Sequence, residues 1–422
     1  MMFDNRERRS SRTRKRPKPA IVQGAPHILR RIAPHLGIAV IAAIVLTLAA
    51  FTAVAAATPA GFDTGRAARG KSATGPWTWS APSRSWTIRT RVLPPALVRR
   101  GPRTTLTRGQ FLAALLRLQR VRGDRSAMLM RSRRHGRALR DARAGSAAAR
   151  AVANGWFSAR NGAFEGSSPI TADDATRAVM AALGMQRDVG RLAITLRDEL
   201  PGTSGVRWYY ASAHALARTL GLRYNVLDPW DELELGPNEP LNVAHGSYML
   251  RAAASVESWK RDEAHRLAET FDLPDLGANQ LLVLGTGVRQ LGQPYVWAGE
   301  TEGDQPEGHG GFDCSGFTIR IVNDSGVPAD QLDHVDERTT YTQSAIPSRD
   351  RLTIDQLQPA DLVFFGDSGP SSTPNQNFHV GVYMGNGWFI HSSGGNGGVA
   401  INSLDGWWGD HFSWGRRALR QP

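Results

Sequence analysis

The chain has 422 residues, one cysteine and a formal net charge of +13 at pH 7. This length exceeds what one hydrophobic core usually organises, so a single small domain is excluded and two or three domains are expected. A lone cysteine has no partner within the chain, which excludes an intramolecular disulfide. Its value must therefore lie in packing or in chemical reactivity.

The positive charge is concentrated at the start of the chain. The first twenty residues contain a run of arginine and lysine that only Asp4 and Glu7 oppose. Such a run can bind nucleic acid, but it lacks interleaved aromatic residues and the segment that follows explains it better. We therefore expect no nucleic-acid partner and interpret residues 1–34 as a basic cytoplasmic tail.

An almost uninterrupted apolar stretch occupies residues 35–57. About twenty such residues cross a bilayer as a helix, and positive charge before the stretch places its N-terminus in the cytoplasm. Residues 53–55 and 55–57 both fit the small-x-small pattern of a signal cleavage site. The stretch is therefore either an N-terminal transmembrane helix that acts as an uncleaved signal anchor, or a signal peptide that is cleaved. In both cases the remainder of the chain is expected outside the cytoplasm.

A linker and a repeat region follow. Residues 58–86 are small, polar and rich in glycine and proline, which is typical of a linker. Residues 87–276 carry a weak internal repeat, in which three segments precede an amphipathic helical pattern in the same register. These segments are Leu106-Thr107-Arg108, Ile170-Thr171-Ala172 and Leu241-Asn242-Val243. Thr or Asn stands at each N-cap, where its side chain accepts a hydrogen bond from an orphan backbone N–H. We expect a mainly α-helical module.

This repeat resembles S-layer homology repeats, which form a three-part helical module that holds exported proteins to cell-wall polymers. The resemblance is partial, because the family's basic residue after the threonine is kept only as Arg108, while Ala172 and Val243 replace it elsewhere. Two interpretations stay open for residues 87–276: binding of anionic wall polymers, and a degenerate spacer. The Arg- and Ala-rich segment at residues 122–150 is either a solvated helix or a surface for anionic lipids or wall polyanions.

The single cysteine, Cys314, lies between glycines in residues 311–317 (GFDCSGF). The apolar pattern after it predicts a helix that ends at the polar, Gly and Pro residues 323–328. A helix N-terminus favours the thiolate over the thiol and lowers the thiol pKa. This position therefore favours a nucleophile over a buried structural cysteine.

Two histidines follow on a predicted β-hairpin. Strands are expected at Phe378–Met384 and Trp388–Ser392, joined by a Gly-Asn-Gly turn. His379 opens the first strand and His391 lies near the end of the second, so antiparallel pairing brings the imidazoles together. A thiolate nucleophile needs a base, and the base needs an orienting group. A metal site with Cys314 is a weaker alternative, because the three residues lack compact ligand spacing; we expect neither a metal nor a cofactor.

These motifs resemble the NlpC-type family of papain-like cell-wall cysteine peptidases, over roughly the last third of the chain. Further matches stand in the family's order: Gly292–Gly299 (GQPYVWAG), Arg338-Thr339-Thr340 with Gln343, and Leu357–Phe365 (LQPADLVFF). The resemblance implies an α+β papain-like domain at residues 277–422. In it, the nucleophile helix packs on an antiparallel sheet that also contains a strand at Asp361–Phe365.

The resemblance also implies a role for six residues. By position, Cys314 is the nucleophile, His379 the general base and His391 the third, orienting residue. The substrate-contacting positions are Tyr295, whose hydroxyl lies beside the nucleophile, Asp313 and Ser315.

The chain departs from the family pattern at two places. An acidic, Gly-rich insertion occupies residues 300–310, where it is expected to line or cover the mouth of the cleft. Ala360 stands where the family has glycine before Asp361, a change that we expect to be minor. No position of the expected triad is lost.

The resemblance implies an exported peptidoglycan hydrolase that attacks an amide carbonyl of the stem peptide through Cys314. The family commonly cuts between D-glutamate and the diamino acid, although the same triad also serves acyl transfer. The alternative is a wall-attached scaffold or peptide-binding protein with an inactive or restrained papain-like domain. The expected partners are stem peptides, with the membrane contacted through residues 35–57. The expected location is the cell membrane with the catalytic domain outside, or the cell wall after signal cleavage.

Overall fold

The computed structural model describes residues 81–122, 136–223, 234–301 and 310–420. All of them belong to one compact unit, Gly75–Pro422. The predicted basic tail and membrane-spanning stretch, residues 1–57, lie outside the described ranges. Within those ranges, the longest apolar helices are too short to span a bilayer. The predictions for residues 1–57 therefore stay predictions.

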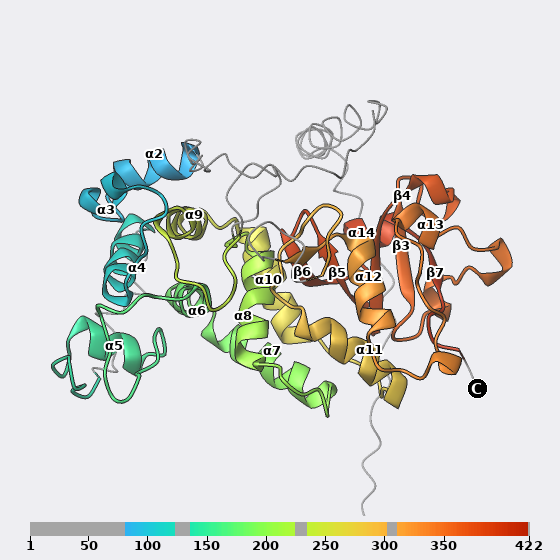
Figure 1. Cartoon of the computed structure of the whole chain (residues 1–422), viewed down its shortest axis with the longest axis horizontal. Coiled ribbons are helices and arrows are strands. Elements are labelled where there is room, and N and C mark those ends of the chain that lie inside the picture. The colour runs from blue at the N-terminus through green and yellow to red at the C-terminus, as the bar shows by residue number, and fades with distance from the viewer. Residues whose placement is uncertain (1–80, 123–135, 224–233, 302–309, 421–422) are drawn as a thin grey trace, which may run out of the picture. The chain divides into compact units, whose positions relative to one another are not determined.

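The N-terminal half of the described chain is helical (Figure 1). Its helices are α2 (Ala81–Thr90), α3 (Pro95–Arg100), α4 (Arg108–Arg122), α5 (Ala147–Ala153), α6 (Ala172–Ala182), α7 (Gln186–Glu199), α8 (Trp208–Thr219), α9 (Val243–Ala254), α10 (Ser258–Thr270) and α11 (Ala278–Arg289). Helix α2 begins inside the segment predicted as linker. It packs on α9, where Arg251 donates a hydrogen bond to the buried hydroxyl of Ser83.

The three predicted repeat helices begin where the sequence pattern placed them. They are α4, α6 and α9, preceded by Thr107, Thr171 and Asn242. Each of these side chains accepts a hydrogen bond from the backbone N–H three residues further on. The caps satisfy donors that a helix start leaves unpaired, so the predicted starts are confirmed.

The segments before these caps bind one another through their backbones. The Leu106 N–H donates to the Leu241 carbonyl (2.8 Å), the Ile170 N–H to the Leu106 carbonyl (3.0 Å), and the Leu241 N–H to the Ile170 carbonyl (2.8 Å). We call this closed ring the backbone triangle. All three side chains are buried in the core. The internal repeat is thus visible as three equivalent helix starts, while the resemblance to S-layer homology repeats stays a prediction.

The C-terminal part combines helices with an antiparallel sheet (Figure 1). Its elements are β1 (Glu300–Thr301), β2 (Gly311–Phe312), α12 (Cys314–Asn323), α13 (Thr340–Gln343), β3 (Leu362–Gly366), β4 (Asn377–Gly385), β5 (Trp388–Ser393), β6 (Gly398–Ser403), α14 (Gly406–His411) and β7 (Phe412–Arg416). The main sheet has the strand order β6-β5-β4-β3-β7. Helix α12 packs on β4 and β5, and α11 packs on α12. The predicted mixture of a helix and an antiparallel sheet is confirmed.

Strand residues alternate between two cores. Leu362 and Phe364 of β3 join the large core beneath α12, whereas Val363 and Phe365 join a smaller cluster with Phe389. This alternation follows from the period of two in a strand. The large core is continuous from the helical module into the sheet, so the two regions share buried apolar surface.

The predicted hairpin is also confirmed, because β4 pairs antiparallel with β5. The residues between the strands, Asn386 and Gly387, have φ of 50° and 81°. Asparagine and glycine adopt this left-handed backbone more readily than other residues, which is why the turn reads clearly in the sequence.

Candidate active site

Cys314 is the first residue of α12, as the sequence predicted. The residue before it, Asp313, is the N-cap, and its carboxylate accepts the Gly316 N–H at 2.7 Å. Gly316 also lets the chain approach closely, since a Cβ there would lie 2.1 Å from the Gly299 carbonyl oxygen. The start of α12 is therefore fixed by a side-chain cap and a glycine contact.

A polar network surrounds this cap. Arg338 donates to both carboxylate oxygens of Asp313 (2.9 and 3.1 Å) and to the Ser315 hydroxyl (2.9 Å). Ser315 in turn donates to Asp313 (3.2 Å), and the Ala298 N–H donates to the same carboxylate (3.1 Å). Asp313 and Ser315 are thus engaged within the protein, which favours a role in holding the helix start. Their predicted contact with substrate stays a prediction.

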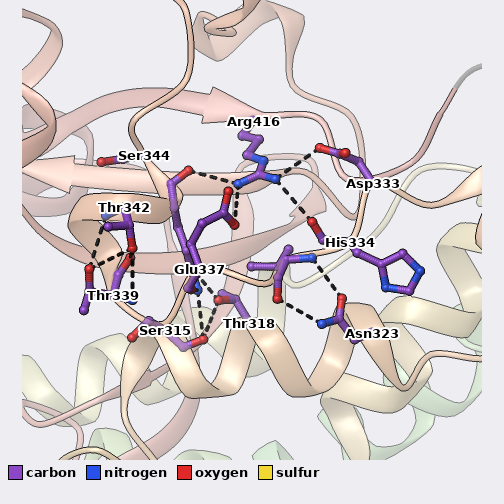
Figure 2. Close-up of polar contacts among 12 residues, drawn as sticks. Ser315, Thr318, Asn323, Asp333, His334, Glu337, Thr339, Thr342, Ser344 and Arg416 are labelled. Carbon is purple, nitrogen blue, oxygen red and sulfur yellow. Dashed lines mark hydrogen bonds and ion pairs between the residues drawn. The ribbon is translucent and has the colours of Figure 1, made fainter.

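Arg338 and Thr340 reach the helix start from residues 333–344. Figure 2 shows how Arg416 of β7 fixes this segment through Asp333 (3.2 Å), Glu337 (3.0 Å) and the His334 carbonyl (3.3 Å). Charge-assisted hydrogen bonds of this kind are stronger than neutral ones. The segment is therefore held against both the sheet and α12.

The Cys314 thiol is half-buried and lies 3.3 Å from the Thr340 hydroxyl oxygen. Burial raises the pKa of this thiol, and the negative charge of Asp313 raises it further. Hydrogen bonds from Thr340 and from the backbone of Val380 and Ser315 act in the opposite direction. The predicted lowering of the pKa was wrong, because desolvation and the capping carboxylate outweigh the helix start. The Val380 contact brings the sulfur to the strand position beside His379.

Tyr295 forms a parallel β-bridge with Phe312, two residues before Cys314, and interacts electrostatically with the thiol. The predicted place of its hydroxyl beside the nucleophile stays a prediction. The Tyr295 pKa is raised mainly by burial and next by the charges of Cys314 and Asp313. The Tyr295 N–H donates to the Gly397 carbonyl (3.1 Å), which fixes its backbone beside the loop after β5. At neutral pH the phenol therefore keeps its proton and can donate a hydrogen bond.

The two histidines meet across the hairpin. His379 Nε2 lies 2.7 Å from His391 Nδ1, and His391 Nε2 lies 2.9 Å from the Asn402 carboxamide oxygen. Because that oxygen only accepts, His391 Nε2 carries the proton of that ring and donates it in a hydrogen bond. His391 Nδ1 therefore accepts a hydrogen bond from the N–H at His379 Nε2. His379 Nδ1 is then left without a proton, as a general base requires.

Burial keeps both imidazoles neutral. It holds the pKa of His379 well below 6.5, with the neighbouring His391 as a second cause. It also lowers the pKa of His391 to about 4, although the hydrogen bond to Asn402 opposes this shift. Trp408 lies against both rings, at 5.1 Å and 5.0 Å between ring centroids. The pair is therefore enclosed by aromatic surface.

Sequence reasoning missed Asn402 and Trp408. Asn402 lies in β6, a strand that follows the Gly-rich residues 394–398 and reads as loop. Arg338 belongs to one of the motifs that match the family, but no role was predicted for it. Its signal was a single arginine directly before Thr339, the N-cap of α13.

The structure describes Ala360, but it describes only the ends of the acidic insertion. Residues 302–309 of the insertion lie outside the described ranges, while Glu300 forms an ion pair with Arg338. Ala360 is buried and has φ of 80°, a conformation that favours glycine. The substitution there is therefore less minor than expected, because an L-residue is strained in this region.

Comparisons with known proteins agree with the resemblance in the C-terminal third. Residues 292–417 match the model of the NlpC/P60 family. The chain is 36% identical over 163 residues to the gamma-D-glutamyl-L-lysine dipeptidyl-peptidase of Bacillus cereus, covering 38% of this chain and 42% of that protein. It is 30% identical over 133 residues to the murein DD-endopeptidase MepH of Escherichia coli, covering 31% and 43%.

A third relative is the peptidoglycan endopeptidase RipA of Mycolicibacterium smegmatis, with 31% identity over 116 residues, 26% of this chain and 20% of that protein. Among solved structures, an NlpC/P60 family protein from Bacillus cereus is 31% identical, covering 35% of this chain and 42% of that chain, with a TM-score of 0.27. The chain spans less than half the length of these relatives. The predicted family resemblance is confirmed for the C-terminal third.

Proposed function

We propose that the NlpC/P60 region of this chain, residues 292–417, is a cysteine peptidase that hydrolyses an amide bond in peptidoglycan stem peptides. The observation that carries this proposal is a half-buried thiol at a capped helix start, beside an oriented pair of neutral histidines. A nucleophile next to a base that a third group orients is the arrangement of covalent catalysis. Two of the matched relatives are named as a peptidoglycan endopeptidase and a murein DD-endopeptidase, and the third as a gamma-D-glutamyl-L-lysine dipeptidyl-peptidase.

In the proposed mechanism, Cys314 and His379 are both neutral at rest, since burial raises the thiol pKa and lowers the imidazole pKa. As Sγ attacks the amide carbonyl, His379 Nδ1 takes the thiol proton. It then gives that proton to the leaving amine as the C–N bond breaks, which leaves a thioester. Water attacks the thioester with His379 again as base, releasing the carboxylic acid and restoring the thiol.

The remaining residues of the site orient the base and stabilise the negative charge that develops on the substrate. His391 accepts a hydrogen bond from the N–H at His379 Nε2 and is itself oriented by Asn402, so the base keeps one tautomer. Developing negative charge on the carbonyl oxygen is stabilised by backbone N–H groups at the start of α12. We assign the Tyr295 hydroxyl, which stays protonated at neutral pH, as a further donor to this oxygen.

We assign the bond between D-glutamate and the diamino acid as the target. The support is the relative from Bacillus cereus, which is named for the gamma-D-glutamyl-L-lysine unit and is 36% identical over the matched residues. Since such a substrate lies outside the cytoplasm, the catalytic region is placed there, anchored by residues 35–57 or released after signal cleavage.

Wall-polymer binding by the helical module has weaker support. Arg108, the one basic residue kept in the repeat pattern, is fully buried. It donates to the Phe164 carbonyl (2.8 Å) and the Ser158 carbonyl (2.5 Å) and pairs with Asp174 (3.2 Å). These contacts use the guanidinium inside the fold, which favours the spacer interpretation for residues 87–276.

The test is digestion of purified peptidoglycan by the full-length protein and its Cys314→Ala variant, with fragments identified by mass spectrometry. Release of stem-peptide fragments only by the intact thiol supports the proposal and identifies the bond. A folded protein that releases nothing, with a Cys314 that iodoacetamide does not label, supports the inactive scaffold. Because the chain has one cysteine, the label reports on this site alone.

A further inference from the structure

Arg218 of helix α8 forms hydrogen bonds with residues outside the helical module. The side chain of Arg218 is fully buried, and its guanidinium donates to the Gly292 carbonyl (2.6 Å) and the Gly397 carbonyl (2.5 Å). Both carbonyls belong to the NlpC/P60 region. An arginine of the helical module therefore satisfies backbone acceptors of the NlpC/P60 region, which we also call the catalytic region.

These carbonyls flank Tyr295. The Gly397 oxygen accepts from Arg218 and also from the Tyr295 N–H (3.1 Å). Next to it, the Val399 N–H donates to the Gln293 carbonyl (2.9 Å). Arg218 thus contacts both segments, residues 292–295 and 397–399, whose pairing fixes the backbone of Tyr295. Tyr295 in turn pairs with Phe312, two residues before Cys314.

The guanidinium is held in place from behind. Both carboxylate oxygens of Glu234 accept from Arg218 (3.0 and 3.1 Å), and Glu234 also binds Arg223 (2.6 Å). Arg223 contacts His214 Nδ1, and His214 Nε2 lies 2.5 Å from Asp173 Oδ1. A buried ion pair adds little stability compared with apolar packing. We therefore interpret the pair with Glu234 as a contact that orients the Arg218 guanidinium.

We propose that Arg218 is a positioning residue for the Tyr295 side of the active site, so that the helical module completes the peptidase. The planar guanidinium bridges two carbonyls that no longer share a fixed spacing once it is removed. Tyr295 then moves relative to Cys314, and the thiol becomes more accessible to solvent. The cleavage measurement below depends on the proposed function, whereas the exchange and labelling measurements do not.

The first experiment follows amide exchange in full-length Arg218→Ala. Exchange at Tyr295 and Val399 is expected to be at least about tenfold faster than in the parent, while Val382 in the centre of the sheet is unchanged. Unchanged exchange at all three amides, or equal acceleration at all three, overturns the proposal.

Arg218→Lys keeps a charge opposite Glu234 but cannot reproduce the planar fork. It is the variant of choice if Arg218→Ala does not fold, and an intermediate exchange rate at Tyr295 is expected. Parent-like exchange in a folded Arg218→Lys protein would mean that charge alone matters, which also overturns the bridging role.

The second experiment compares Arg218→Ala with Arg266→Ala. Arg266 of α10 also links the helices to the catalytic region, through Ser403 (2.6 Å) and Asp405 (3.2 Å), but away from Tyr295. Arg218→Ala should lower kcat/KM about tenfold or more, mainly through kcat, and speed iodoacetamide labelling of Cys314, whereas Arg266→Ala stays within about twofold. Equal effects of the two variants overturn the proposal. If the parent itself does not cleave peptidoglycan, the proposed function fails, while labelling and exchange still decide the role of Arg218.

Discussion

The two regions of the molecule fix their important helix starts by different means. In the helical module, the segments before α4, α6 and α9 hold one another through the backbone triangle. In the catalytic region, the start of α12 is held by side chains, with the Asp313 carboxylate bound by Arg338, Ser315 and two backbone N–H groups.

This difference explains how much of each region is readable in the sequence. A backbone hydrogen bond can be made by any residue except proline as donor, so the repeat tolerates Thr or Asn at its caps and unrelated residues after them. A side-chain network needs particular side chains, so the catalytic motifs can be recognised in the sequence. Substitutions that loosen these helix starts should therefore lower the rate in the catalytic region and the stability in the helical module.

The largest effect is expected for Arg338→Ala. It leaves the Asp313 carboxylate without its bidentate partner and releases the start of α12, so kcat should fall roughly 100-fold. The matched control is Arg349→Ala, because the Arg349 side chain is 83% exposed and should change kcat by less than twofold or so. A parent-like rate in Arg338→Ala would break the contrast between the two regions.

A smaller loss is expected for Asn402→Ala. Without the carboxamide oxygen, His391 can place its proton on either nitrogen, so the base loses its single tautomer and kcat falls about tenfold with little change in KM. Asn279, a partly exposed residue that donates to Gln331, provides the control substitution to alanine. Steady-state kinetics with a purified stem peptide distinguishes the two, and an equal loss in both variants would count against the assigned tautomer.

The pH profiles of labelling and cleavage should separate. Because burial raises the thiol pKa, iodoacetamide labelling of Cys314 should rise with pH through a midpoint above 9. Because the His379 pKa lies well below 6.5, the base stays unprotonated and cleavage should persist below pH 6.5. Labelling that is already at a plateau between pH 5 and 8 would instead show a thiolate–imidazolium pair at rest.

In the helical module, Thr171→Ala should affect stability and not rate. It removes the N-cap hydrogen bond to the Asp174 N–H, so the free energy of unfolding should fall by about 1 kcal/mol. Urea unfolding measures the change, with Thr195→Ala, at a partly exposed position of α7, as control. A loss of kcat at unchanged stability would show that this cap is coupled to the active site.

The smallest effect is expected for Ala360→Gly. Glycine relieves the positive φ of 80° but also gives the unfolded chain more freedom, so a net gain of roughly 0.5–1 kcal/mol in the free energy of unfolding is expected. Ala345→Gly, at a residue without positive φ, should destabilise instead. If both variants lose stability equally, Ala360 is not strained.

The sequence predicted the local parts of the site and missed those that depend on distant pairing. Cys314 at a helix start and the His379–His391 contact across a hairpin follow from local pattern and turn chemistry, and both are confirmed. Asn402 reaches His391 only through the pairing of β6 with β5, which a Gly-rich segment concealed. The thiol pKa was mispredicted for a related reason, because burial is a property of the assembled fold.

The backbone triangle also limits the order in which the chain can fold. Its three segments lie far apart along the chain, and each bond joins two different repeats. As the chain emerges N-terminus first, Leu106 finds its acceptor only once Leu241 has appeared, so long loops must close before any repeat is complete. The three repeats are thus expected to fold in one cooperative step, and a chain that ends before Leu241 should keep none of them folded.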